Sequence, residues 1–343
     1  MEDIKLTQYS HGAGCGCKIS PAVLDTILHT NFSPKQFPGL LVGNESKDDA
    51  AVFQVSDDTC IISTTDFFMP IVDDPFTFGA IASVNAISDV YAMGGTPIMA
   101  IAILGWPINK IPGKIAGQVL DGSRKVCEDA GIPLAGGHSI DCPEPVFGLA
   151  VTGNVRKQHL KRNDTAQAGS FLYLTKPLGV GITTTAQKKN VVKKEHLEAA
   201  TASMLKLNKL GADVGKLSYV NAMTDVTGFG LLGHLCEVCE GSALSADIDM
   251  AHIPQFDFLN FYIQQKCIPG GTIRNWDSYG SKVSSISEDQ KAVLADPQTS
   301  GGLLISVDST HSDEFEKFVL SQGYELKPFG KLIPKARHVI NVR

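Results

Sequence analysis

Gly79-Ala-Ile-Ala-Ser-Val-Asn85-Ala-Ile-Ser-Asp89-Val-Tyr-Ala-Met93 is the stretch of sequence that decides the fold. It is almost free of charge and is followed by Gly94-Gly95, so it predicts a largely buried helix that ends near Met93. An unpaired carboxylate on a buried face is costly, which makes Asp89 unusual. Asn85 lies four residues earlier on the same face, and two oxygen-bearing side chains at this spacing suit a hard cation such as Mg2+.

The segments on either side of this helix predict strands and a second helix. The runs from Ala51 to Val55 and from Cys60 to Thr65 flank a short turn and predict a hairpin. A buried strand is expected from Ile98 to Leu104, a helix from Ile115 to Ala130 and another strand from Val146 to Val155. This half of the chain therefore mixes paired strands with covering helices.

A length of 343 residues exceeds what one hydrophobic core supports, so two domains are expected. The polar stretch from Arg156 to Gly169 is the best candidate boundary. We expect an N-terminal arm with its lead-in over 1–45, an ATP- and metal-binding, dimerising domain over 46–156, and a C-terminal α+β domain over 157–343. The last domain is expected to hold a long helix from Glu195 to Lys216 and strands at 171–175, 243–248, 303–307 and 338–342.

Composition excludes several classes of protein. A net charge of −6 gives no electrostatic reason to expect nucleic acid or an anionic membrane as a partner. The longest apolar stretch, from Pro97 to Ile108, is interrupted and falls short of the roughly 20 residues needed to span a bilayer. Eight cysteines are too few for a disulfide scaffold of this length, and no secretory signal precedes them, so a reducing cytoplasm is expected.

The segment His11-Gly-Ala-Gly-Cys15-Gly-Cys17-Lys18 carries two thiols and an amine on a glycine-rich backbone. Its glycines favour a loop that can swing over a site. A lysine beside a thiol favours the nucleophilic thiolate, so the pattern predicts that Cys15 and Lys18 form a reactive pair. A loose N-terminus is the alternative, as is a zinc site in which Cys15 and Cys17 join Cys236 and Cys239. The latter pair lies in a Leu-rich helix, where buried cysteines are common, so zinc is the minority interpretation.

Further aspartates lie at the edges of apolar elements: Asp48 and Asp49 precede a strand, Asp66 follows one, and Asp225 lies in Met223-Thr-Asp-Val-Thr-Gly228. Each alone is as easily a cap or a turn residue as a ligand. Carboxylates repel a nucleotide triphosphate, so a phosphate site built on them requires metal ions. The turns at 135–139, 269–272 and 299–302 contain Gly-Gly and could hold phosphate through backbone N–H groups, although none is a Walker A loop.

Together these motifs resemble the selenophosphate synthetases (selenide, water dikinases) from about Thr7 to about Gly330. The resemblance rests on HGAGCGCK at 11–18, GNESKDDAAV at 43–52, STTDFFMPIVDDP at 63–75, NAISDVYAMGG at 85–95, LAGGHSID at 134–141, AMTDVTGFGLLGHL at 222–235, PGGT at 269–272 and DPQTSGGLL at 296–304. The aspartate motifs alone indicate only the wider superfamily of aminoimidazole-ribonucleotide synthetase-like ATP enzymes. The Cys/Lys arm narrows the resemblance to one family.

The resemblance implies a two-domain α+β fold of the aminoimidazole-ribonucleotide synthetase type, with mixed sheets covered by helices and a mobile glycine-rich arm. It implies a reaction in which ATP, selenide and water give selenophosphate, AMP and phosphate, and in which Mg2+ is required. It also implies a homodimer that binds ATP near the dimer interface. By motif, Cys15 is the reactive residue and Lys18 the essential lysine, which also contacts the nucleotide. The implied metal ligands are Asp49, Asp89 and Asp225, and the implied nucleotide contacts are Asp48, Asp66, Asp89 and Gly137, His138 and Ser139, these last three from the neighbouring subunit.

There are two alternatives, one within the same superfamily and one from a different class of protein. Another ATP-dependent member of the superfamily, such as an aminoimidazole-ribonucleotide synthetase or a thiamine-phosphate kinase, would keep the aspartates but has no evident use for the Cys/Lys arm. A non-catalytic zinc or selenium carrier would use Cys15, Cys17, Cys236 and Cys239. The sequence does not identify a selenide-delivery protein or a role for Cys17.

Overall fold

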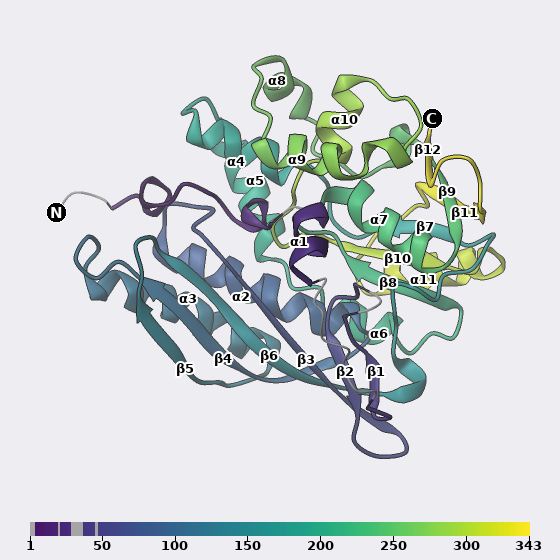
Figure 1. Ribbon diagram of the computed structural model, residues 1–343, viewed down its shortest axis with the longest axis horizontal. Helices are drawn as coiled ribbons and strands as arrows, with labels where there is room; N and C mark the ends of the chain where they lie inside the picture. Colours follow the sequence, from purple (N-terminus) through teal and green to yellow (C-terminus); the bar gives the residue numbers. More distant parts are fainter. Residues whose placement is uncertain (1–3, 20, 29–36, 45–46) are drawn as a thin grey trace.

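The structure is a computed structural model that describes residues 4–19, 21–28, 37–44 and 47–343 (Figure 1). The chain forms two six-stranded mixed sheets, one built from residues 40–156 and the other from 171–342. Helices cover them, so the predicted α+β class is confirmed. No helix within the described residues combines the length and the apolar character needed to cross a membrane.

The first sheet has the strand order β1-β2-β3-β6-β4-β5. The strands are β1 (Leu40–Val42), β2 (Ala51–Gln54), β3 (Thr59–Phe68), β4 (Thr96–Trp106), β5 (Leu134–Asp141) and β6 (Val146–Arg156). All neighbours are antiparallel except β4 and β5. The β2–β3 pair confirms the predicted hairpin. Strand β1 lies inside the stretch that sequence analysis assigned to the arm and lead-in, so the sheet begins earlier than residue 46.

Helix α2 (Pro75–Ala92) is the central element of the molecule. It begins earlier than the sequence predicted, because the Asp74 carboxylate accepts a hydrogen bond from the Thr77 N–H at 2.7 Å and Pro75 suits the first helical position. Every residue from Phe78 to Ala92 is buried. The helix packs on β3 and β6 on one side and on elements of the second domain on the other, which explains its uncharged composition.

Helix α3 (Gly113–Ala130) packs closely against α2 through glycine. A Cβ on Gly122 would lie 1.9 Å from the Phe76 carbonyl oxygen, whereas a Cβ on Gly117 of the same helix would meet nothing within 4 Å. We therefore expect Gly122→Ala to lower the free energy of unfolding by about 1–3 kcal/mol, and Gly117→Ala to raise it by about 0.5–1 kcal/mol. Urea unfolding of both variants checks this, and equal effects would contradict the close helix approach.

The second sheet has the order β12-β9-β11-β7-β10-β8. Its strands are β7 (Phe171–Leu174), β8 (Val220–Asp225), β9 (Leu244–Ile248), β10 (Leu303–Val307), β11 (Gly330–Pro334) and β12 (Ile340–Val342). Its helices are α4 (Val180–Lys188), α5 (Lys194–Leu205), α6 (Leu210–Val214), α7 (Gly230–Gly241), α8 (Leu259–Gln264), α9 (Gly270–Tyr279), α10 (Glu288–Leu294) and α11 (Ser312–Ser321). Sequence analysis missed β8 and β11.

The single long helix predicted from Glu195 to Lys216 is wrong, because the chain breaks between α5 and α6. Asn208 lies in the break and is buried. Its side-chain amide donates to the Ser88 hydroxyl at 2.8 Å and to the Gly301 carbonyl at 2.9 Å. These two hydrogen bonds connect Asn208 to residues that are distant in sequence. The helical periodicity of the local sequence cannot predict a tertiary contact of this kind.

Two predictions about the first sheet also need correction. Strand β4 is not buried on both faces, because Ile98, Met99 and Ile101 are 42–46% exposed. The stretch 135–139 is not a turn but part of β5, an edge strand that pairs only with β4 among the described strands. Helices α2 and α3 cover one face of this sheet, and Figure 1 shows its other face turned away from the helices.

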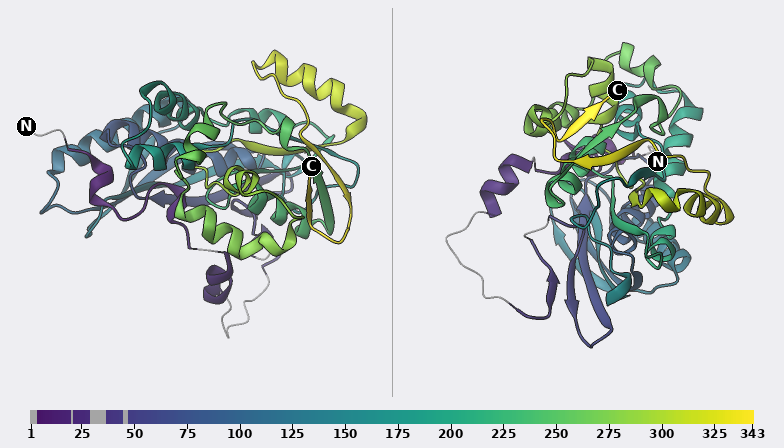
Figure 2. Two further views of the ribbon diagram at one scale, coloured as in Figure 1. Left: turned by 90° about the horizontal axis from the view of Figure 1, so that it is seen from above. Right: turned by 90° about the vertical axis from the view of Figure 1, so that its right-hand side faces the viewer.

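The N-terminal arm lies against both domains. It comprises the 3-10 turns η1 (Leu6–Tyr9) and η2 (Cys15–Cys17), followed by α1 (Pro21–Leu28), which stands out from the body in Figure 2. Gly14 pairs with Met69 and adopts a φ of 51°, and a Cβ there would lie 2.3 Å from the Thr299 hydroxyl. Glycine is needed at this close approach. The structure thus describes the docked arrangement of the arm, and its mobility stays a prediction.

Candidate active site

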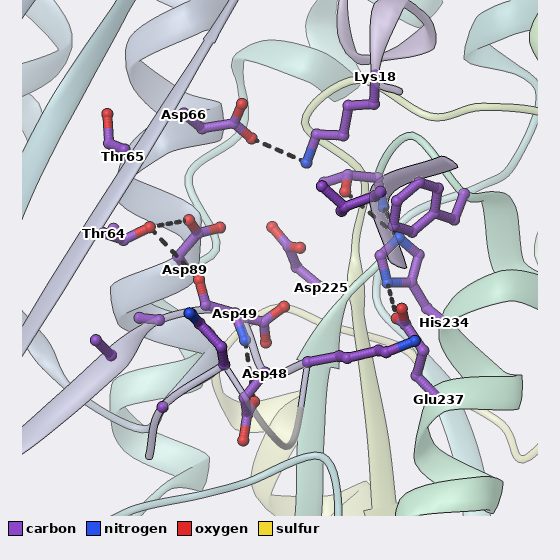
Figure 3. A pocket seen from close by; sticks show the side chains of 18 of the residues that line it. Lys18, Asp48, Asp49, Thr64, Thr65, Asp66, Asp89, Asp225, His234 and Glu237 are labelled. Carbon is purple, nitrogen blue, oxygen red and sulfur yellow. Dashed lines mark hydrogen bonds and ion pairs between the residues drawn. The ribbon is translucent and has the colours of Figure 1, made fainter. Parts of the chain in front are cut away.

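A cavity of about 460 Å³ lies where the two domains meet. Five aspartates gather around it: Asp48, Asp49, Asp66, Asp89 and Asp225. Figure 3 shows the side chains of Asp49, Asp66, Asp89 and Asp225 around one shared space, with Lys18 above them and the Asp48 carboxylate turned away from it. We call this space the carboxylate cavity. The sequence singled out this set from four separate motifs, and the structure brings the five residues together around one cavity.

Three hydroxyl groups hold the predicted metal ligands in place. The Thr64 hydroxyl of β3 donates to Asp89 of α2 at 2.5 Å. The Thr224 hydroxyl donates to Asp49 at 2.9 Å, so strand β8 of the second domain fixes a loop of the first. The Ser88 hydroxyl of α2 donates to Asp225 at the end of β8, also at 2.5 Å. The last two bonds cross between the domains, so the ligand set depends on how the domains dock.

The carboxylate cavity holds several buried acidic groups close together, which makes their ionised forms unfavourable. Burial raises the pKa of Asp49, Asp89 and Asp225 above the ordinary aspartate value, and repulsion between neighbouring carboxylates raises the pKa further. Burial likewise raises the pKa of Asp48 to about 7. One oxygen of Asp49, Oδ2, is buried without a hydrogen-bond partner among the described residues. Such a cluster requires positive charge from outside the carboxylate set.

These residues fit a divalent cation with an incomplete protein shell. In the part of the chain that the structure describes, no three His, Cys, Asp or Glu side chains converge closely enough to enclose a metal by themselves. Mg2+ usually keeps several waters and takes only one or two carboxylates together with substrate phosphates. The unpartnered oxygen of Asp49 and the buried carboxylates of Asp89 and Asp225 match that kind of site.

Cys15 and Lys18 reach the same region from the arm. The Lys18 ammonium lies 3.3 Å from a carboxylate oxygen of Asp66 and lines the carboxylate cavity. The Cys15 thiol is 1% exposed and donates to the side-chain oxygen of Asn85 at 3.2 Å. Asn85 in turn donates to Asp66 at 2.7 Å. A short polar chain therefore links the thiol to the carboxylates.

The expectation that Lys18 keeps Cys15 ionised is not met in this arrangement. Burial and the neighbouring Asp66 raise the pKa of Cys15 well above the ordinary thiol value, and Lys18 offsets this only in part. Although burial opposes it, Asp66 together with Cys15 raises the pKa of Lys18, so the lysine stays charged. The sequence places Lys18 near the thiol, but only the fold shows that Asp66 takes the closest contact.

Asn85 has a different role from the one predicted. Its side-chain oxygen accepts from the Cys15 thiol and also from the Ser300 N–H at 2.7 Å, so it is not directed into the carboxylate cavity as a ligand. Asn85 is fully buried. It positions the arm and the loop after α10 on the central helix, and Thr299 in that loop accepts from the Cys15 N–H at 3.0 Å.

Gly137, His138 and Ser139 do not line the carboxylate cavity of the same chain. They lie in edge strand β5, on the far side of the first sheet from the site, and are exposed. Their contact with nucleotide therefore stays a prediction that needs a second chain.

The zinc interpretation is wrong for the cysteines that the structure describes. Cys236 and Cys239 are buried in the core of the second domain, while Cys15 packs in the core of the first. The side chain of Cys17 lies outside the described residues.

His234 and Glu237 of α7 also line the carboxylate cavity, and sequence reasoning did not assign them to it. The His234 ring nitrogen Nε2 accepts from the Thr227 N–H at 3.1 Å, and the other ring nitrogen lies 3.3 Å from Glu237. Their i, i+3 spacing, directly after the Asp225 motif, was the available signal. These side chains close the cavity on the side of the second domain (Figure 3).

Comparison with known proteins identifies the family of the chain. Residues 47–155 match the family "AIR synthase related protein, N-terminal domain", and residues 167–343 match the corresponding C-terminal domain. A selenide, water dikinase of Pseudomonas putida is 59% identical over 341 residues, which cover 99% of each chain. The chain belongs to the selenide, water dikinase family. The wider superfamily and the narrower family expected from the sequence are both confirmed.

Solved structures confirm the fold of this dikinase family member. A thiamine-monophosphate kinase of Stenotrophomonas maltophilia aligns with a TM-score of 0.66 at 18% identity, over 90% of this chain and 92% of the other. The protein AaThiL, solved with AMPPCP and TMP, also gives 0.66, at 15% identity over 94% and 91%. At such low identity these likenesses concern the fold alone.

Proposed function

We propose that the protein uses ATP to make selenophosphate from selenide and water, releasing AMP and phosphate. The observation that carries this proposal is the meeting of Lys18 with five aspartates at one cavity, to which the Cys15 thiol is linked through Asn85 and Asp66. The name shared by relatives such as that of Pseudomonas putida supports it. The alternatives are less favoured, since an ATP enzyme without selenium chemistry leaves the Cys15–Asn85 contact unexplained.

Within this proposal Asp49, Asp89 and Asp225 hold Mg2+ against the phosphates of ATP. The ion would supply charge neutralisation and alignment, which phosphoryl transfer requires more than covalent help. Lys18 adds positive charge at the mouth of the cavity, and Asp48 and Asp66 contact the nucleotide. The docked arm excludes water around Cys15, whose thiol contacts the bound selenide without forming a sulfur–selenium bond, so neither atom changes its oxidation state.

Phosphorus-31 NMR tests the reaction directly. Purified protein is incubated anaerobically with ATP, Mg2+ and selenide, and we expect a phosphorus signal split by selenium, together with AMP and inorganic phosphate. Omitting selenide is the control for simple ATP hydrolysis. ATP turnover that yields no selenium-bound phosphorus would reject the proposal.

We also propose a homodimer. Support comes from the apolar face of the first sheet, where Phe67, Ile101 and Ile140 are 46–59% exposed, and from the predicted contact of His138 with nucleotide in another chain. Sedimentation analysis should find a dimer, and Ile101→Glu should shift it toward a monomer. A monomeric wild-type protein would contradict this.

The reducing cytoplasm stays our proposed location. It is consistent with the seven cysteines described as free, none of which forms a disulfide.

A further inference from the structure

A second cavity, of about 300 Å³, lies beside the arm and is distinct from the carboxylate cavity. Three side chains that can carry positive charge line it, His11 of the arm, Lys188 of α4 and Arg274 of α9. The first residues of α9, Gly270 and Gly271, also line it, and first-turn N–H groups of a helix have no partner within the helix. We call it the basic cavity.

The two cavities have opposite charge. The carboxylate cavity is lined by five aspartates and Glu237, whereas no acidic residue lines the basic cavity in the described part of the chain. Two carboxylates lie just outside the lining: Glu144 pairs with the His11 ring at 2.9 Å, and the buried Asp296 accepts from the N–H of Gly181, a lining residue, at 2.9 Å. An anion is therefore repelled at one entrance and attracted at the other.

The arm separates the two spaces, and Cys15 lies between them. Lys18 lines the carboxylate cavity, whereas Gly16 lines the basic one. The backbone N–H of Cys15 donates to Thr299, which also lines the basic cavity. The thiol of Cys15 donates a hydrogen bond to Asn85, on the side of the carboxylate cavity. The thiol is thus one side chain away from either space.

Lys188 and Arg274 hold the arm from the basic cavity without using all their donors. Lys188 donates to the Gly12 carbonyl at 2.8 Å and Arg274 to the Gly16 carbonyl at 2.9 Å. An ammonium has three N–H donors and a guanidinium five, so each keeps donors for a further acceptor. Both cations therefore flank the segment that carries Cys15.

We propose that the basic cavity binds the small anionic chalcogenide substrate, hydrogen selenide in its monoanionic form, and delivers it to Cys15 from the side opposite to ATP. This inference rests on the proposed function. Its physical basis is that bound nucleotide fills the carboxylate cavity and adds negative charge there, while the basic cavity stays open and attracts an anion to the same thiol.

Adding a carboxylate to the basic cavity tests the proposal while the two arm contacts remain. At Gly270 a Cβ would meet only the flexible Arg274 side chain, at 3.3 Å, and an aspartate in the first turn of a helix is favourable. We expect Gly270→Asp to raise the KM for selenide at least about tenfold over Gly270→Asn, its uncharged match in shape, with the KM for ATP unchanged. Equal selenide KM values in the two variants would overturn the proposal.

Removing the cations gives the complementary test. Lys188→Gln with Arg274→Gln should raise the KM for selenide, and Lys189→Gln, next in sequence but outside the lining, should not. If the double variant instead raises the KM for ATP and leaves that for selenide unchanged, the cations only fasten the arm and the anion site is refuted.

A probe of Cys15 that needs no turnover separates this inference from the proposed function. Peptide mapping compares the alkylation of Cys15 by iodoacetate, an anion, with that by neutral iodoacetamide. The iodoacetate-to-iodoacetamide ratio should fall severalfold in Gly270→Asp relative to Gly270→Asn. An unchanged ratio overturns the basic cavity as the route, whereas wild-type protein that makes no selenophosphate rejects the proposed function alone.

Discussion

Replacing Cys15 by serine is expected to abolish selenophosphate formation and to leave the binding of ATP with Mg2+ nearly unchanged. We expect kcat to fall at least about 1,000-fold, because a serine hydroxyl lacks the soft, polarisable sulfur that we assign to the contact with selenide. The thiol contacts Asn85 and not the aspartates that we assign to the metal. Calorimetric titration with a non-hydrolysable ATP analogue, alongside the phosphorus-31 assay, measures both effects.

The fold should tolerate this change, because a serine hydroxyl can keep the hydrogen bond to Asn85. Cys142→Ser is the matched control, since Cys142 is partly exposed and lies outside the carboxylate cavity, and it should retain full activity. A large loss of nucleotide affinity in Cys15→Ser would show that the thiol belongs to the nucleotide site, against the separation of roles proposed here.

Asp89→Asn should have the reverse effect and remove the binding of ATP with Mg2+. The change keeps the shape and the hydrogen bond from Thr64 but removes a buried negative charge. Because Asp89 is assigned as a direct ligand, we expect a loss of at least about 100-fold in metal-dependent nucleotide affinity. The control is Asp121→Asn, the same charge change at an exposed position of α3, which should bind normally. Normal nucleotide binding by Asp89→Asn would remove Asp89 from the metal site.

The same variant should change how stability depends on pH in the absence of divalent cations. Burial, then repulsion from Asp225, raises the pKa of Asp89 above 3.8, so the folded state holds this proton more tightly than the unfolded state. The resulting stabilisation is complete below the unfolded pKa and is lost as pH rises through the folded pKa. The melting temperature should therefore fall less between pH 5 and pH 8 in Asp89→Asn than in the wild type.

Local patterns were enough to predict much of the framework. Strands β2, β3, β6 and β10 and helix α3 follow from alternation, helical periodicity and flanking turns, which are properties of neighbouring residues. Helix α2 was predicted because a nearly uncharged segment that ends at two glycines is typical of a buried helix. Strand β8 and the break at Asn208 were missed, since both depend on partners that are distant in sequence.

The sequence singled out the aspartates and the Cys/Lys pair from their residue types and motifs, and the structure brings them to one region, while their chemical roles stay predictions. Their mutual arrangement was not predictable. Thr224, Ser88 and Thr299 hold site residues across the domain boundary, and nothing in their own neighbourhoods marks them. The pairing of Lys18 with Asp66 instead of Cys15 likewise depends on how deeply the arm is buried.

The sequence by itself determined which groups are available to this protein: carboxylates that we assign to a cation, and a thiol with an amine on a glycine-rich arm. Only the tertiary structure decided that the thiol lies between an acidic and a basic cavity, one on either side of the arm. The physical reason is that the electrostatic field at Cys15 sums contributions from α2, α4, α9 and the loop after α10, and no single stretch of sequence contains that sum.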